Sequence, residues 1–282
     1  MILKKKQVLI LIVVLLIILN SSTIQAENFS SFLQKNKCQE TTKQTNNYLK
    51  ILEPKNTSCK TFSKNYTALI LNPSEYIYGK QHCLKITSKL INKGYNVVYL
   101  SNECVDLNFI KNNLSAEIVY INTHAGYFDL DNDNISESVV VATGEHWTNE
   151  TTIKYQFEYE NKMIVEGRVG NNSFVAFTPN LINYYYNPGD LPNSLVYMAT
   201  CYATYDDSMA QVFLDKGASA YIGWNKNTFF WTNSITSVLA FRLFINGFSV
   251  KQVCKLIGFG GFMNFLLLQS KLTYYGDGNH RI

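Results

Sequence analysis

The fold is decided by residues 194–224, SLVYMATCYATYDDSMAQVFLDKGASAYIGW. Two short apolar runs, residues 195–198 and 220–222, flank a segment whose apolar residues recur at helical spacing. Short apolar runs joined by a helix predict a β-α-β unit of a parallel sheet that is buried on both faces. Cys201 follows the first run, so we expect it at the carboxyl edge of the sheet, where α/β proteins place ligands and chemistry.

The helix expected after Cys201 has its own start and stop signals. Thr204 and Asp207 have the spacing of a capping box, and Gly217 can end the helix. A thiol just ahead of a helix start lies near its positive end, which favours the reactive thiolate.

A second apolar run, residues 118–121, leads into His124. Two parallel strands that end in His and Cys can bring imidazole and thiol together, which makes the cysteine a nucleophile. Taken singly, His124 could be a structural histidine and Cys201 a small buried hydrophobe. Because both follow strands of one predicted sheet, we interpret them as a catalytic pair.

The remaining pattern predicts a doubly wound, mostly parallel α/β sheet. Residues 137–186, between the His and Cys strands, alternate and are rich in β-branched residues, so we expect a β-hairpin or β-meander insertion there. Further strands are expected at residues 68–71 and 97–100, and helices at residues 80–91, 105–112, 230–246 (closed by Gly247) and from Ser249, whose spacing to Gln252 is that of a capping box.

Residues 1–26 have the pattern of a signal peptide: a lysine cluster, an apolar run of 12 residues from Val8 to Leu19, and a small-residue site at Ala26. The run is short for a membrane span, so we expect export with cleavage, with an uncleaved membrane anchor as the alternative. Residues 27–65 are polar and predict a cysteine-containing leader or prosegment. The mature protein would be secreted or held at the cell surface.

Export permits disulfides, and the chain has six cysteines. Cys254 shares a helical face with apolar residues, so we expect a buried core thiol, which leaves Cys201 as the cysteine in a reactive context. The four cysteines that precede the His strand are expected to be oxidised, in any of three pairings: Cys38, Cys59, Cys83 and Cys104.

The distribution of charged residues indicates which kinds of partner the protein can bind. The net charge is +4 with no basic stripe, which argues against nucleic-acid binding. Asp129, Asp131 and Asp133 have the alternating spacing of a structural calcium loop, although Asn134 and Val140 depart from an EF-hand, and a solvated acidic loop is the alternative. The other three histidines have no partner at metal-ligand spacing, which argues against a zinc enzyme.

The strand ending in His124-Ala-Gly, the later strand ending in Ala-Thr-Cys201, and GASAYIGW after a helix resemble the caspase-like cysteine peptidases, most closely the gingipain and clostripain kind. The resemblance covers residues 66–282, which would form the peptidase domain, and includes the terminal YYGDG. It implies His124 as general base and acid, Cys201 as nucleophile, and Trp224 as a wall of the substrate pocket. The implied oxyanion hole consists of the backbone N–H groups of Ala125, Gly126 and Cys201.

Two features depart from the family pattern. Ala125 separates His124 from Gly126, where the family usually has Gly directly after His, and its methyl group would crowd a substrate carbonyl. The gap of 77 residues between His124 and Cys201 is long, and the β-rich insertion accounts for it.

The sequence therefore predicts an exported cysteine endopeptidase that acts on peptide or protein substrates and requires no cofactor apart from the calcium considered above. A transpeptidase of the same chemistry and a catalytically inactive surface binding module are the alternatives. Sortases place an Arg soon after Cys, whereas here the first is Arg242, and papain-like enzymes place Cys before His. Contact with a membrane is expected only through an uncleaved N-terminal segment.

Overall fold

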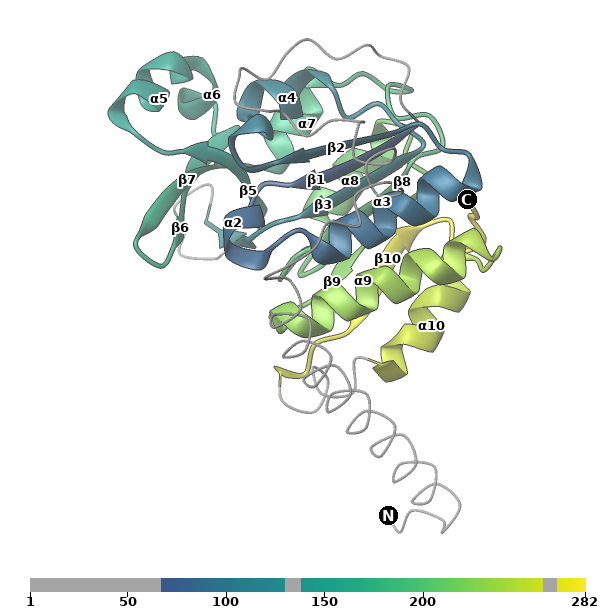
Figure 1. Cartoon of the computed structure of the whole chain (residues 1–282). Coiled ribbons are helices and arrows are strands. Elements are labelled where there is room, and N and C mark those ends of the chain that lie inside the picture. Colours follow the sequence, from purple (N-terminus) through teal and green to yellow (C-terminus); the bar gives the residue numbers. More distant parts are fainter. Residues whose placement is uncertain (1–66, 130–137, 261–267) are drawn as a thin grey trace, which may run out of the picture. The chain divides into compact units, whose positions relative to one another are not determined.

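The computed structural model describes residues 67–129, 138–260 and 268–282 (Figure 1). Its main sheet has six strands in the order β10-β9-β8-β3-β1-β2. All neighbours pair in parallel except β10, which runs antiparallel to β9. The strands are β1 (Ala68–Asn72), β2 (Val97–Ser101), β3 (Ile118–Asn122), β8 (Leu195–Ala199), β9 (Ala220–Trp224) and β10 (Leu272–Gly276).

Four central strands, β1, β3, β8 and β9, are buried along their whole length, which explains their continuous apolar sequences. Alternate side chains of each strand enter two different core clusters, one on each face of the sheet. One face packs against α3 (Gln81–Lys93), α9 (Phe230–Ile245) and α10 (Val250–Gly260), and the other against α4 (Leu107–Asn112), α7 (Pro179–Tyr185) and α8 (Ser208–Asp215). The expected α/β fold with a mostly parallel sheet is confirmed.

The segment between β3 and β8 forms a second sheet, as the sequence predicts. Its four strands are antiparallel, in the order β4-β5-β7-β6. They are β4 (Ala125–Phe128), β5 (Ser138–His146), β6 (Ile164–Val169) and β7 (Asn172–Phe177).

Part of this insertion is helical, where β-structure was expected. The helices α5 (Asn149–Lys154) and α6 (Gln156–Glu160) cover positions whose β-branched and aromatic residues had suggested strands. A capping box starts α5: Thr151 N–H donates to Thr148 Oγ1, and Thr148 N–H donates to Thr151 Oγ1. This local N-terminal cap outweighs a weak strand propensity.

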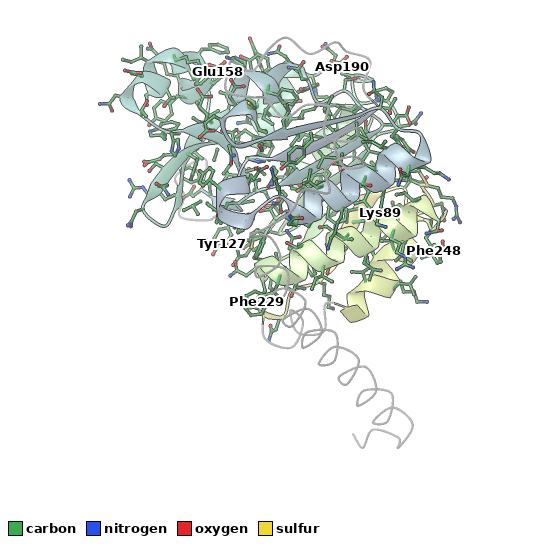
Figure 2. The ribbon with its side chains drawn as sticks, viewed as in Figure 1. Lys89, Tyr127, Glu158, Asp190, Phe229 and Phe248 are labelled. Carbon is green, nitrogen blue, oxygen red and sulfur yellow. The ribbon has the colours of Figure 1, made fainter. Side chains whose placement is uncertain are left out.

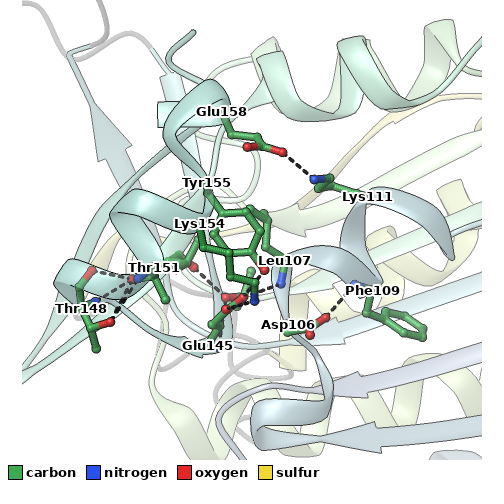
Figure 3. Close-up of polar contacts among 12 residues, drawn as sticks. Asp106, Leu107, Phe109, Lys111, Glu145, Thr148, Thr151, Lys154, Tyr155 and Glu158 are labelled. Atoms are coloured by element: carbon green, nitrogen blue, oxygen red, sulfur yellow. Dashed lines mark hydrogen bonds and ion pairs between the residues drawn. The ribbon is translucent and has the colours of Figure 1, made fainter. Parts of the chain in front are cut away.

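Glu145 of β5 joins these short helices to α4 (Figure 3). Its carboxylate accepts hydrogen bonds from the N–H of Leu107 in α4, at 3.1 Å, and from the hydroxyl of Tyr155, at 3.0 Å. It also pairs with Lys154 at 2.8 Å. A second ion pair, between Lys111 and Glu158, joins α4 to α6. The insertion is therefore fixed to the layer that carries α4.

Two of the predicted helix-capping residues are confirmed, and a third prediction is wrong. Ser249 and Gln252 cap α10 reciprocally, and Gly217, at φ 106°, ends the turn after α8. However, Thr204 and Asp207 form no capping box: α8 begins at Ser208, Asp207 makes no side-chain cap, and Thr204 Oγ1 instead donates to the Gly223 carbonyl.

Candidate active site

The two predicted catalytic residues follow neighbouring parallel strands. Asn122, the last residue of β3, pairs in register with Ala199, the last residue of β8. His124 and Cys201 each come two residues after this pair. Neighbouring strands lie about 4.8 Å apart, so the register brings both residues to the same short stretch of the sheet's carboxyl edge.

His124 is half-buried beneath Tyr78, the last residue of the short helix α2 (Glu75–Tyr78). The Tyr78 hydroxyl lies 2.8 Å from His124 Nδ1 and 2.6 Å from Nε2, so the tautomer decides which group donates. Burial lowers the pKa of His124 to about 4. The imidazole is therefore neutral at pH 7 and able to accept a proton.

Cys201 is also half-buried, and its partner is the loop between β9 and α9. The Thr228 N–H donates to Cys201 Sγ at 3.3 Å. Burial raises the pKa of the Cys201 thiol, and this hydrogen bond offsets part of the rise. The neutral thiol is therefore the resting form at pH 7.

This result corrects the expectation that the cysteine rests as a thiolate. The helix α8 begins seven residues after Cys201, so the thiol does not lie at its positive end, and desolvation controls the pKa instead. Within the described part of the chain, the side-chain hydrogen bonds of His124 and Cys201 go to Tyr78 and Thr228 and not to each other. Catalytic hydrogen bonds are often completed only when substrate binds.

The backbone beside His124 leaves room for a substrate. A β-carbon built on Gly126 would meet no atom within 4 Å, so the space next to this residue is open. Ala125 packs against the core cluster that β4 covers, so its methyl group is engaged with protein rather than in that space. The assignment of the N–H groups of Ala125, Gly126 and Cys201 to an oxyanion hole stays a prediction.

Trp224, the predicted wall of the substrate pocket, is a buried core residue. It is 1% exposed, and its indole belongs to the core cluster that packs against α9. Its Nε1–H donates to Asn233 Oδ1 at 2.9 Å. The side chain lies on the face of the sheet that α3, α9 and α10 cover, so its burial gives no support to a role as a pocket wall, which stays a prediction.

Three buried asparagines, which were not among the predicted site residues, form a hydrogen-bonded chain next to the candidate pair. Asn122 Nδ2 donates to Asn72 Oδ1 at 2.8 Å, and Asn233 Nδ2 donates to Asn122 Oδ1 at 3.3 Å and to the Ala199 carbonyl at 2.9 Å. Asn72 and Asn122 each end a buried strand, and a polar residue at that position was the available signal. The chain connects β1, β3, β8 and α9 directly below the candidate pair.

The predictions for the cysteines have different outcomes. Cys254 is a core thiol as expected, 8% exposed, and burial raises its pKa to about 12. Cys83 is a free thiol, fully buried between α3 and the main sheet, which contradicts its predicted place in a disulfide. No disulfide joins two cysteines of the described ranges, so Cys83 and Cys104 are not bonded to each other, and Cys38 and Cys59 lie outside those ranges.

Several other predictions fall on residues outside the described ranges. These are the signal segment 1–26, the leader at 27–65, and Asp131 and Asp133 of the acidic loop, of which only Asp129 is described. Among the described residues no group of three or more His, Cys, Asp or Glu is arranged to hold a metal ion, and no helix is long and apolar enough to cross a membrane. Calcium binding and export remain predictions.

Two aromatic residues from segments beside the candidate pair lie on the same side of the view in Figure 2. Tyr127 of β4 and Phe229, which precedes α9, are found there, and Phe248 is at the opposite side. Aromatic rings surround the site: Tyr78 stacks on Phe230 with centroids 4.8 Å apart, and Tyr127 lies 5.0 Å from Tyr202, the residue after Cys201.

Comparisons with known proteins give fold-level likenesses only. No family model and no curated protein matches the chain. One similar solved structure is the complex of Porphyromonas gingivalis RgpB pro- and mature domains, with a TM-score of 0.48 and 12% identity over 77% of this chain and 48% of that one. Another, described as a structure of a protease, has a TM-score of 0.46 and 12% identity over 78% of this chain and 49% of that one. The chain thus spans about half the length of each, and likenesses of this size assign it no activity.

Proposed function

We propose that the chain is a cysteine peptidase of the caspase-like kind, in which Cys201 is the nucleophile and His124 the general base and acid. The observation that carries the proposal is the register of β3 and β8. The last residues of the two strands, Asn122 and Ala199, pair with each other, and a His and a Cys each follow two residues later. Imidazole and thiol brought together at the carboxyl edge of a parallel sheet are the two groups that acyl transfer through a thioester requires.

The general-base mechanism starts from a neutral imidazole and a neutral thiol, although the low pKa of His124 makes it a weak base before substrate binds. A neutral His124 can take the proton of the neutral Cys201 thiol while sulfur attacks the carbonyl carbon of the peptide bond. His124 then gives that proton to the leaving amine as the C–N bond breaks, which leaves an acyl-enzyme. Water, deprotonated by His124, releases the carboxylic acid and restores the thiol.

Tyr78 acts in this proposal as the residue that orients the base. A base in such a pair is usually held by a third group, and the Tyr78 hydroxyl is the hydrogen-bond partner of the His124 ring. Burial raises the pKa of Tyr78, so the hydroxyl stays protonated and can donate. If it donates to one imidazole nitrogen, that nitrogen is the unprotonated one, and the choice of tautomer is fixed.

The signal-like residues 1–26 favour action on peptides or proteins outside the cytoplasm. The test is hydrolysis of a peptide library by the purified chain and its variants. Cys201→Ala and His124→Ala should each lower kcat/KM by roughly a thousandfold or more, and the double variant should be no worse, because members of such a pair act as a unit. Cys254→Ala, a core thiol away from the pair, is the matched control and should retain most of the activity.

Two outcomes would contradict the proposal. Full activity in either single variant would exclude the mechanism. A folded wild-type chain that cleaves nothing would instead favour the inactive binding module. If products appear joined to an added amine rather than hydrolysed, the same pair serves a transpeptidase.

A further inference from the structure

An apolar pocket of about 420 Å³ opens beside the candidate site, between the start of α3 and the start of α9. Its size falls within the range of about 300–1,000 Å³ that is usual for small-molecule sites. The walls that matter for its chemistry are Tyr78, Lys85, Phe230, Trp231, Ile235 and Val238.

The pocket shares residues with the environment of the proposed catalytic pair. Tyr78 forms part of its wall, and the hydroxyl of the same tyrosine bonds His124. The Tyr78 ring stacks on Phe230 with an interplanar angle of 11°, and Phe230 comes two residues after Thr228, whose N–H bonds Cys201 Sγ. A group held in the pocket would therefore contact Tyr78 and Phe230, which lead to His124 and Cys201.

The apolar side chains of the pocket are left unusually open to water. Trp231 is 59% exposed and Ile235 is 68% exposed, one turn apart on α9. A ligand that covers these side chains would remove their apolar surface from water, and the free energy of that burial favours binding. Two large exposed apolar residues on one helix face beside a pocket thus indicate a binding surface.

The charges of the pocket select against basic ligands. No carboxylate belongs to the described residues that line it, and its charged side chain is that of Lys85. A lysine or arginine of a substrate would find no partner there and would be repelled by Lys85, at a cost that grows as water is excluded.

We propose that this pocket binds one large apolar side chain, aromatic or leucine-like, of the peptide substrate close to the bond that is cleaved. The inference rests on the proposed peptidase function and adds the substrate class. Trp231 and Ile235 are the specificity-determining residues, and Tyr78 joins recognition to the reacting pair.

The first test compares blocked peptides that are identical except for Phe, Leu or Arg at each position around the cleaved bond. At one position Phe and Leu should be preferred to Arg by at least about tenfold in kcat/KM. Trp231→Ala should reduce cleavage of the Phe peptide about tenfold, and Ile235→Glu should reduce it and improve the Arg peptide. Leu256→Ala removes a side chain that is 51% exposed on α10, outside the pocket, and should change neither.

The second test measures binding without chemistry, in the Cys201→Ala variant, by titration with acetyl-Phe-amide and acetyl-Arg-amide. We expect tighter binding of the Phe compound, weakened by Trp231→Ala and not by Leu256→Ala. If the wild type cleaves peptides but Phe and Arg compounds bind equally, the pocket inference is wrong and the peptidase proposal survives. If nothing is cleaved but the Phe preference and its dependence on Trp231 persist, the pocket binds as inferred and the peptidase proposal fails.

Discussion

Replacing His124 with Gln should make the fold less sensitive to acid. Burial lowers the pKa of His124 to about 4 from its ordinary value of 6.5. Between these two pH values the unfolded chain binds a proton at this residue that the folded chain does not, so the free energy of unfolding falls as the pH falls. The stabilisation is complete above pH 6.5, and a shift of this size corresponds to a loss of up to ~3 kcal/mol by about pH 4.

The measurement is urea denaturation of the wild type and His124→Gln at a series of pH values from about 4 to 7.5. Other groups that titrate in this range, including His82 and His280, whose pKa values burial also lowers, are present in both chains. The difference between the two curves therefore isolates His124. Its pH dependence should amount to ~3 kcal/mol across the series, with the wild type losing more.

A control separates this effect from general destabilisation. Leu90→Ala removes a fully buried side chain of α3 and should cost ~2–5 kcal/mol at every pH, so that its curve runs parallel to the wild type. Parallel curves for His124→Gln and the wild type would refute the argument that desolvation holds this imidazole neutral.

Two further predictions follow from buried polar groups. Alkylation of Cys201 by iodoacetamide should be slow at pH 7 and still accelerating above pH 9, because burial raises the pKa of this thiol above its ordinary 9.0; a rate that is already level at neutral pH would contradict this. Asn233→Ala should lower the free energy of unfolding by ~2–4 kcal/mol, because it leaves the Trp224 indole N–H and the Ala199 carbonyl without this partner. Asn246→Ala, at an exposed position at the end of the same helix, should cost less than ~1 kcal/mol, and equal losses would contradict the assigned role of Asn233.

The sequence was sufficient for the five parallel strands of the main sheet, because burial on both faces requires continuous apolar strands, but it did not predict the antiparallel strand β10. Runs such as residues 118–121 and 195–198 have no other plausible place in a domain of this size, and the positions of His124 and Cys201 after them follow directly. The helices α5 and α6 were missed because short segments rich in Thr, Ile and aromatic residues resemble strands in composition. The Thr148–Thr151 cap distinguishes α5 from a strand, whereas α6 has no side-chain cap.

The surroundings of the site could not be predicted, because they depend on the order of strands in the sheet. Periodicity places Trp224 at the end of an apolar run, but which face of the sheet it occupies depends on how β9 pairs with its neighbours. The pKa of Cys201 likewise depends on the loop that carries Thr228, which lies next to the thiol only after β8 and β9 have paired.

The strand order explains why the functional groups gather where they do. From β1 the chain crosses to β2 through α3 on one face, whereas from β2 it returns past β1 to β3 through α4 on the other face. The direction of winding therefore reverses between β1 and β3, and the segments that leave these strands diverge and open a crevice at their carboxyl ends. Tyr78 follows β1 and His124 follows β3, so the two residues that hydrogen-bond in this structure come from the two sides of this switch point. Cys201, after the next strand, and the apolar pocket beside Tyr78 adjoin the same crevice, which is where a doubly wound sheet is expected to bind its ligand.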